Sequence, residues 1–395
     1  MPNTNRNGKI AIKGVQKMLN TVKILHTADL HLGAVNNAIG QKAALRRAEK
    51  LLCLERIFEL CKLKGVELLL IAGDLLDNNT VDSAITERFF ELVKASPELQ
   101  VVFAAGNHDP LSADSPFVNT APPENLHILS TAPEIKELPN LPVRILGCSF
   151  AGVRKTGTEN FPILPVQDDK INIMVIHGDL GSDISGPYNT ITNGFLQNSG
   201  CDYVALGHIH AFSGIEKAGG TYYAYPGCPD GGGFDELGKK GVIVAELSKG
   251  NIQPEFVTTS TRTYECENVD VSAAANSADA AEIVKRALSE KFGADYKNNL
   301  YKIILCGGLE SGVQLNTSEI KARLEECVYY AKVKDSTTLR VDLESLKNEN
   351  SLKGKFVNIM LEKANNANEE EKRQIMRGLY LGLAAFASEV TLYEN

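Results

Sequence analysis

Short apolar segments alternate with polar turns and amphipathic stretches along the first part of the chain. Segments 22–25, 68–71 and 101–103 are rich in apolar residues, whereas 41–62 and 83–94 repeat apolar residues at helical spacing. A strand, a helix and a further strand in succession favour right-handed crossovers and parallel pairing. In parallel sheets, binding sites form beyond the carboxyl ends of the strands. The pattern therefore predicts an α/β fold with a site at one edge of the sheet.

The pattern changes to mostly strands after the Pro-rich loop at 121–124. We expect these strands at 126–129, 143–150, 171–176, 203–206, 221–225 and 242–247. Two sheets packed face to face, with helices outside, would bury them. The Gly-rich stretch 227–241 is too loose for a regular element and is expected to form a loop.

The length of 395 residues exceeds the roughly 250–300 residues that one core supports, so more than one domain is expected. A change in composition near 262–270 indicates the boundary. The elements expected beyond it are a helix at 273–291, a strand at 301–306, a helix opened by Thr317, a strand at 337–343 and a last helix capped by Asn368 with Glu371. The sequence thus predicts a flexible extension over residues 1–21, a main domain over 22–262 and a small α+β accessory or capping domain over 263–395.

The net charge of -8 argues against a protein that coats nucleic acid, because phosphate binding depends on Lys and Arg. Any DNA would have to follow a local basic path. The candidates are Lys42, Arg46, Arg47 and Lys50, then Arg154 and Lys155, then Lys239 and Lys240.

No segment reaches the roughly 18 uninterrupted apolar residues that a membrane span requires. The eight cysteines include no C-x-x-C pair, which fits reduced thiols better than disulfides or a zinc site. We therefore expect a cytoplasmic protein without a membrane partner.

Polar motifs follow five of the expected strands. They supply carboxylate, amide and imidazole groups from Asp29, His31, Asp74, Asp77, Asn107, His108, His177, His208 and His210. The other two of the seven histidines, His26 and His127, lie within strands and are expected to be structural. Oxygen and imidazole ligands without thiolate favour manganese, iron or zinc over calcium.

Alternation along a strand would send Asp29 and His31 to the same side, and the same spacing relates His208 to His210. Asp74, in a tight turn, is suited to bridge two cations. A water shared by two cations loses a proton near neutral pH and attacks phosphorus. His108 is a candidate to stabilise the transition state or to protonate the leaving oxygen, with Asp77 to orient it.

The motifs together resemble the calcineurin-like metallophosphoesterases. They are Asp29-x-His31, Gly73-Asp74-x-x-Asp77, Gly106-Asn107-His108-Asp109, His177-Gly178-Asp179 and Gly207-His208-x-His210. The resemblance implies a four-layer sandwich of two mixed β-sheets flanked by helices, and two divalent metal ions. It implies one metal on Asp29, His31, Asp74 and His210, the other on Asp74, Asn107, His177 and His208. It also implies that His108 is the catalytic acid, paired with Asp77.

Within this superfamily, segment 24–33 (ILHTADLHLG) resembles the SbcD-type DNA repair exonucleases, and segment 225–241 is similar to the YhaO-like branch. Segment 342–354 carries a fainter likeness. The resemblance implies a manganese-dependent exonuclease, with endonuclease activity left open, that acts on DNA ends or hairpins. It also implies an SbcC-like or YhaN-like ATPase partner with a long coiled coil. Any ATP use must belong to that partner, because this chain has no Walker loop. A homodimer through helices within 36–62 or 80–94 is left open.

The alternative is a small-molecule phosphodiesterase or nucleotidase, for instance one acting on cyclic nucleotides, since that branch shares all five motifs. Members of that branch are usually compact single-domain proteins, whereas about 130 residues follow the main domain in this chain. A phosphoprotein phosphatase is disfavoured because Asn78 follows Asp77 and Asp109 follows His108. A non-catalytic scaffold is disfavoured because no ligand is missing.

Overall fold

The computed structural model describes residues 21–138, 140–154, 161–166, 168–181, 186, 188–310, 312–340 and 342–387. Contacts divide the chain into two compact units, separated between Thr263 and Tyr264, and each is described by itself. The extension expected over residues 1–21 lies outside the described residues except for Thr21. Within the described ranges, no helix is long and apolar enough to cross a membrane.

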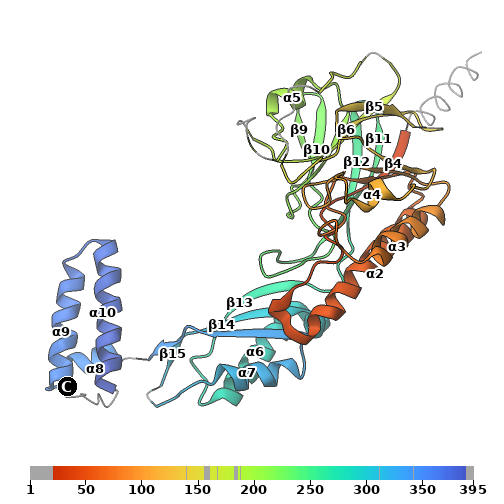
Figure 1. The fold of residues 1–395 in the computed structure, drawn as a ribbon. Helices are drawn as coiled ribbons and strands as arrows, with labels where there is room; N and C mark the ends of the chain where they lie inside the picture. Colours follow the sequence, from red (N-terminus) through yellow and green to blue (C-terminus); the bar gives the residue numbers. More distant parts are fainter. Residues whose placement is uncertain are drawn as a thin grey trace, which may run out of the picture. The chain divides into compact units, whose positions relative to one another are not determined.

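The first sheet of the N-terminal unit contains six strands (Figure 1). Their order is β12 (Asn251–Thr258), β11 (Gly241–Ser248), β1 (Thr21–Thr27), β2 (Leu68–Ile71), β3 (Gln100–Phe103) and β4 (Leu126–Ile128). Strands β1 to β4 are parallel, and β11 pairs antiparallel with both β1 and β12. The connections contain η1 (Asn37–Lys42), α2 (Ala43–Lys64), α3 (Ser83–Lys94) and α4 (Pro116–Asn119). Ile57 of α2 and Phe89 of α3 pack with Phe103 in the core on the outer face.

The second sheet also contains six strands. Their order is β5 (Glu134–Glu137), β6 (Val143–Cys148), β7 (Ile171–His177), β8 (Tyr203–Gly207), β10 (Thr221–Ala224) and β9 (Glu216–Ala218). The inner strands β6, β7, β8 and β10 are parallel, and the two edge strands are antiparallel to their neighbours. Helix α5 (Asn193–Asn198) packs Leu196 against the outer face of this sheet.

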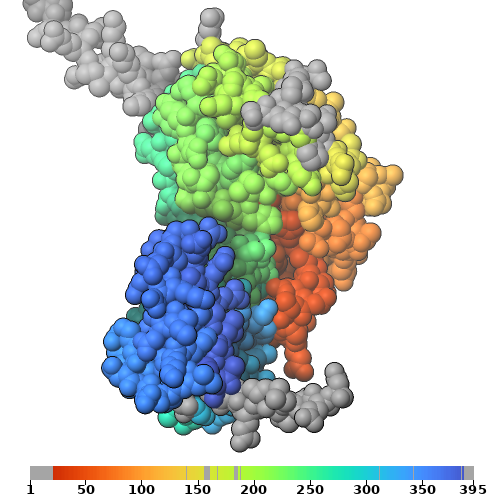
Figure 2. Space-filling view, turned by 90° about the vertical axis from the view of Figure 1, so that its left-hand side faces the viewer, coloured from red at the N-terminus to blue at the C-terminus, as the bar shows by residue number. Residues whose placement is uncertain are grey.

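An apolar core lies between the two sheets. It brings together residues such as Leu70 and Val102 of the first sheet with Ile173 and Val175 of the second. With helices on the outer faces, this order of layers confirms the expected sandwich of two mixed sheets flanked by helices. In the space-filling view, the yellow and green residues, which include the second sheet and its loops, make up much of the visible surface of the N-terminal unit (Figure 2).

The two sheets approach closely at the carboxyl ends of their strands, where glycines replace side chains. A Cβ on Gly207 would lie 1.7 Å from the carbonyl oxygen of Ala72, and one on Gly73 would lie 2.3 Å from Nδ1 of His177. Gly73 also has a positive φ of 89°, which glycine adopts without strain. Any larger residue at these positions would push apart the loops that contain the candidate site.

The C-terminal unit is built on a parallel sheet in the order β13 (Tyr264–Asp270), β14 (Leu300–Cys306) and β16 (Tyr330–Asp335). Helices α6 (Ser277–Phe292) and α7 (Thr317–Glu325), with η2 (Gly293–Asn298), share an apolar core with this sheet. The remaining elements are β15 (Gly308–Leu309), β17 (Thr338–Leu339), α8 (Leu343–Lys347), α9 (Leu352–Asn365) and α10 (Glu369–Ala387). Val357 of α9 packs with Leu379 and Leu383 of α10.

Two expectations for the C-terminal unit can be compared with the structure in detail. The bounds expected for a strand at 337–343 are wrong: among the described residues of that range, only Thr338 and Leu339 form a strand, and the longer strand nearby is β16. Helix α8 begins at Leu343 because the side chain of Asp342 accepts a hydrogen bond from Ser345 N. The capping box of α10 is confirmed: Asn368 accepts from Glu371 N, and Glu371 accepts from Asn368 N in return.

Candidate metal centre

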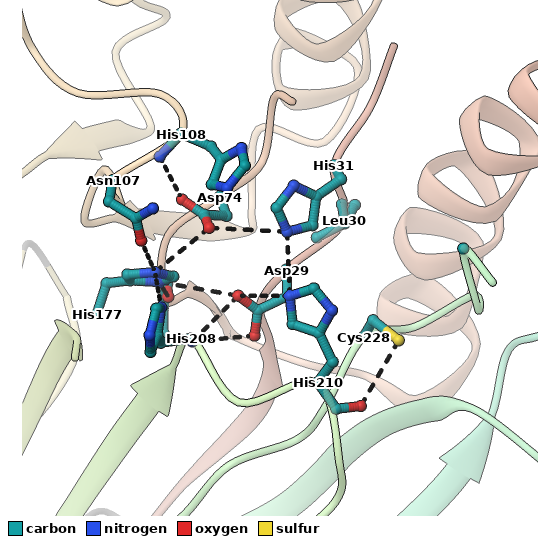
Figure 3. A network of polar contacts seen from close by, with 12 residues as sticks. Asp29, Leu30, His31, Asp74, Asn107, His108, His177, His208, His210 and Cys228 are labelled. Atoms are coloured by element: carbon teal, nitrogen blue, oxygen red, sulfur yellow. Dashed lines mark hydrogen bonds and ion pairs between the residues drawn. The ribbon is translucent and has the colours of Figure 1, made fainter. Parts of the chain in front are cut away.

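The polar groups expected to form a site come together at the carboxyl ends of five strands from both sheets (Figure 3). Asp29 and His31 follow β1, Asp74 follows β2, Asn107 and His108 follow β3, His177 ends β7, and His208 and His210 follow β8. Asp29 and His177 are fully buried, and Asp74 is 2% exposed. Burial of charged and titratable side chains is costly unless they are paired or bind a cation.

The carboxylate of Asp74 lies at the centre of this cluster. Its Oδ2 is 3.4 Å from Nε2 of His177 and 3.7 Å from Nε2 of His31, which belong to opposite sides of the site. Its other oxygen, Oδ1, accepts a hydrogen bond of 2.9 Å from His108 N. Asp74 is therefore placed to share one carboxylate between two groups of donors.

The first group of donors contains Asp29, His31 and His210. The Nε2 atoms of His31 and His210 are 3.2 Å apart, and Nε2 of His210 is 4.0 Å from Oδ1 of Asp29. These three side chains offer ligand atoms within 4.8 Å of one another.

The second group of donors contains His177, Asn107 and His208. Nε2 of His177 lies 3.0 Å from Oδ1 of Asn107 and 3.3 Å from Nδ1 of His208. Imidazole nitrogens and an amide oxygen thus surround a small space next to Asp74.

In each imidazole ring, the nitrogen that faces away from the centre of the site lies close to a hydrogen-bond acceptor. His177 Nδ1 donates to the carbonyl oxygen of Ala72 at 2.9 Å, and His210 Nδ1 contacts the carboxylate of Glu236. His31 Nδ1 is 3.5 Å from Asp77 Oδ1, and His208 Nε2 is 3.4 Å from Asp179 Oδ1. Such partners fix the tautomer of a metal-binding histidine.

In the neutral form of these rings, the inner nitrogens are consequently unprotonated and face each other. Two lone pairs at 3.2 Å, as between His31 and His210, repel unless a proton or a cation lies between them. The donor set of this site therefore fits metal cations.

Burial and charge act against each other in the pKa values of the site. Burial disfavours the charged form of His177, but the carboxylates of Asp74 and Asp29 outweigh it and raise the pKa to about 9. Burial also opposes ionisation of Asp74, yet the neighbouring imidazoles of His177 and His31 hold the pKa of that carboxyl below its usual range. For Asp29, burial is the largest effect and raises the pKa. The buried carboxylates thus stabilise positive charge in the centre.

Four ligand candidates have left-handed backbone conformations. Their φ angles are 55° at Asp29, 46° at His31, 51° at Asp74 and 107° at His208. The expected alternation along a strand does not apply to these residues, because β1 ends at Thr27 and β8 ends at Gly207. The pairs Asp29 with His31 and His208 with His210 lie in the turns that follow. Hydrogen bonds from Asp29 N to Gly73 O at 3.1 Å and from His208 N to Asp29 Oδ1 at 3.0 Å stabilise these strained turns instead.

His108 is exposed and is oriented by Asp77 through the backbone. Its Nδ1 donates to the main-chain carbonyl of Asp77 at 2.9 Å, while the Asp77 carboxylate lies near His31. The Nε2 atom of His108 therefore keeps its capacity to donate or accept a proton. The sequence predicted a pairing of His108 with Asp77 but could not show that the contact is with the main-chain carbonyl of Asp77.

Asp109 is a structural residue of the site that sequence reasoning did not assign. Its fully buried carboxylate accepts hydrogen bonds from the backbone N–H groups of Gly106, Asp74 and Leu76 at 2.7, 3.2 and 3.1 Å. Burial and the nearby Asp74 raise its pKa to about 6. It ties the loop after β2 to the loop after β3, and its position directly after His108 was the only signal in the sequence.

Two of the residues expected to form a basic path to the site are buried and engaged internally. Arg46 is 4% exposed and pairs with Asp230, and Lys240 is 9% exposed and donates to the carbonyl oxygen of His210. The expectation that these two cations line a DNA path is therefore wrong. Arg47 and Lys239 are exposed, while Lys155 lies outside the described residues.

Comparison with known proteins gives a consistent result. The family model described as calcineurin-like phosphoesterase matches residues 22–212. The chain is 29% identical over 286 residues to the uncharacterized metallophosphoesterase YhaO of Bacillus subtilis, and the match covers 69% of each chain. It is 26% identical over 272 residues to the DNA double-strand break repair protein Mre11 of Methanopyrus kandleri, covering 60% of this chain and 56% of that protein. A 93-residue match at 34% identity to the SbcD subunit of the nuclease SbcCD of Rhodobacter capsulatus covers 22% of each.

We expect the substitution Asp109→Asn to destabilise the N-terminal unit without any metal present. An amide has one acceptor oxygen, so at least one of the three buried N–H groups loses its partner, at a cost of about 1–3 kcal/mol in the free energy of unfolding. Urea denaturation in EDTA measures this change. Asp114→Asn, which makes the same charge change at an exposed carboxylate, is the control, and equal stability of the two variants would contradict the role given to Asp109.

Proposed function

Because residues 22–212 form a calcineurin-like metallophosphoesterase domain, a metal-dependent hydrolase of phosphoesters, we propose that this protein is an SbcD/YhaO-like DNA exonuclease that acts in DNA repair. The observation that supports hydrolysis is the convergence of facing imidazole nitrogens and buried carboxylates around Asp74. The choice of DNA rests on the relatives named as a nuclease subunit and as a double-strand break repair protein.

The donor groups suit two divalent cations that share Asp74. One would be held by Asp29, His31, Asp74 and His210, and the other by Asp74, Asn107, His177 and His208. Oxygen and imidazole donors favour manganese, with iron and zinc as alternatives. When bound, such cations neutralise charge on the phosphate and lower the pKa of the attacking water.

His108 is the proposed catalytic acid. Its Nδ1 is occupied by the carbonyl of Asp77, so the ring presents Nε2, the atom that would pass a proton to the leaving oxygen. Its exposure, in contrast to the buried Asp29, Asp74 and His177, suits a group that meets substrate.

DNA and an SbcC-like or YhaN-like ATPase with a coiled coil are the proposed partners, since one relative is named as a subunit of a complex. ATP use would belong to that partner, because this chain has no Walker loop. We place the complex in the cytoplasm.

A small-molecule phosphodiesterase or nucleotidase is the second candidate. The observation that favours it is the internal engagement of Arg46 and Lys240, which removes two cations from the path available to DNA phosphates. The net charge of -8 points the same way.

We expect the purified chain with Mn²⁺ to shorten end-labelled linear duplex DNA and to leave cyclic AMP intact, with no reaction in EDTA. Gel electrophoresis and chromatography of the nucleotides measure the two reactions side by side. Turnover of cyclic AMP with intact DNA would instead select the small-molecule alternative.

We expect His108→Gln to keep its metal content and to lose about 10²–10⁴-fold in kcat. Glutamine is a polar side chain of similar size, but it cannot act as a proton-donating acid. Elemental analysis and initial rates measure the two properties. His127→Gln, in the edge strand β4, is the matched control and should retain activity. Loss of metal in His108→Gln would identify His108 as a ligand and overturn its role as acid.

We expect Asp74→Ala to lose both cations, since each would lose the shared carboxylate. Inductively coupled plasma mass spectrometry after dialysis against Mn²⁺ measures the stoichiometry. Retention of two ions per chain would contradict the bridging role of Asp74.

A further inference from the structure

The Gly-rich segment 227–241 contacts His210 from several directions. The carbonyl oxygen of His210 accepts from Cys228 N at 3.3 Å, from the Cys228 thiol at 3.6 Å and from Lys240 Nζ at 3.1 Å. The ring of the same histidine contacts the carboxylate of Glu236 through Nδ1. Backbone and side chain of one ligand candidate are therefore both fixed by a segment that lacks regular secondary structure.

Glu236 has two carboxylate oxygens with separate tasks. Oε1 contacts His210, while Oε2 accepts from Gly232 N and from the Cys228 thiol at 3.5 Å. The side chain is only 13% exposed. Although burial opposes ionisation, the bonds with His210 and Gly232 lower the pKa of Glu236 to about 2.

The segment is itself anchored to helix α2. Arg46, in the first turns of α2, donates to Asp230 Oδ1 and to Gly231 O, both at 3.0 Å, and the side chain of Asp230 is 2% exposed. Before α2, Asn36 donates to Gly232 O at 2.6 Å. Glu236 thus belongs to a loop that is anchored by hydrogen bonds, and this limits the movement of its carboxylate.

A separate cation on His210, Cys228 and Glu236 is the competing interpretation, because their ligand atoms lie within 4.8 Å of one another. The direct contact between Nδ1 of His210 and the carboxylate leaves no room for an ion between them. Cys228 is 1% exposed and lies beside two oxygen acceptors, and burial favours the neutral thiol over the thiolate that binds metals.

We propose that Glu236 is a positioning residue for His210: it fixes the Nδ1–H tautomer and turns Nε2 toward Asp29 and His31. This inference rests on the proposed function, since it concerns the cation assigned to Asp29, His31, Asp74 and His210. The segment 227–241 then determines the affinity of this one position. The second metal position includes His208. The carboxylate next to the outer nitrogen of His208 belongs to Asp179, lies 3.4 Å away, farther than Glu236 lies from His210, and is 38% exposed.

The test is the substitution Glu236→Gln in the full chain. His210 and Gly232 contact different oxygens of Glu236, and glutamine replaces one of these oxygens with an NH2 group, so one of the two contacts is lost. We expect about 10–100-fold weaker binding of Mn²⁺ at one of two positions and unchanged binding at the other, measured by competition titration of the metal-free protein. Asp235→Asn, an exposed carboxylate in the same segment, is the control and should match the unsubstituted chain.

A second measurement separates positioning from a general effect on folding. Nitrogen-15 NMR of the histidine side chains in EDTA should show the Nδ1–H tautomer of His210 in the unsubstituted chain and a tautomer mixture in Glu236→Gln. Glu236→Asp, which keeps a carboxylate, should recover part of the Mn²⁺ affinity. Activity of Glu236→Gln should return at saturating Mn²⁺.

Mn²⁺ affinities in Glu236→Gln that are unchanged from the unsubstituted chain at both positions, or an unchanged tautomer of His210, would overturn the proposal. Equal weakening at both positions would also overturn it, because the effect would then not act through His210. These readouts need no substrate. Failure of the unsubstituted chain to hydrolyse DNA or cyclic AMP would therefore count against the proposed function and not against the positioning role.

Discussion

The candidate site depends on a close and fixed contact between two sheets that come from distant parts of the chain. Asp74 follows a strand of the first sheet, whereas His177, 3.4 Å away, ends a strand of the second. Polar contacts fix this distance in addition to the apolar core. His26 of β1 contacts the hydroxyl group of Tyr203 at 2.8 Å and the carbonyl oxygen of Leu206 at 3.1 Å, both in β8. A shift of one sheet by about 1 Å would break such bonds, because their length varies by only a few tenths of an ångström.

This constraint explains why the core strands and the site residues could be predicted from the sequence. A strand buried on both faces is mostly apolar, so β2 and β7 stand out as largely apolar runs that end in a polar motif. The ends of parallel strands meet at one edge, so five such motifs indicate one site before any distance is known. Helix α3 was expected with its observed bounds because Phe89, Phe90 and Val93 recur at helical spacing on one face.

The features that could not be predicted from the sequence depend on long-range contacts that the local sequence does not encode. Strand β16 alternates lysine with apolar residues and was missed, because its pairing with β14 is a long-range contact. The side chains that support the ligands, Glu236 and Asp109, are acidic residues like many on the surface, and only their burial distinguishes them. Arg46 and Lys240 show the converse case: basic residues that suggested a path for phosphates are instead internal supports of a loop.

The distance in sequence between the two sheets also orders events during synthesis of the protein. His26 and Leu206 are 180 positions apart, and Glu236 emerges 26 positions after the last ligand candidate, His210. A nascent chain therefore exposes the carboxylates and imidazoles of the first sheet long before their partners exist. The carboxylate of Asp29 acquires its backbone donor, His208 N, only once the second sheet docks. The complete set of candidate ligands can thus come together only after the second sheet has been synthesised and has docked, so an unfinished chain lacks the assembled site.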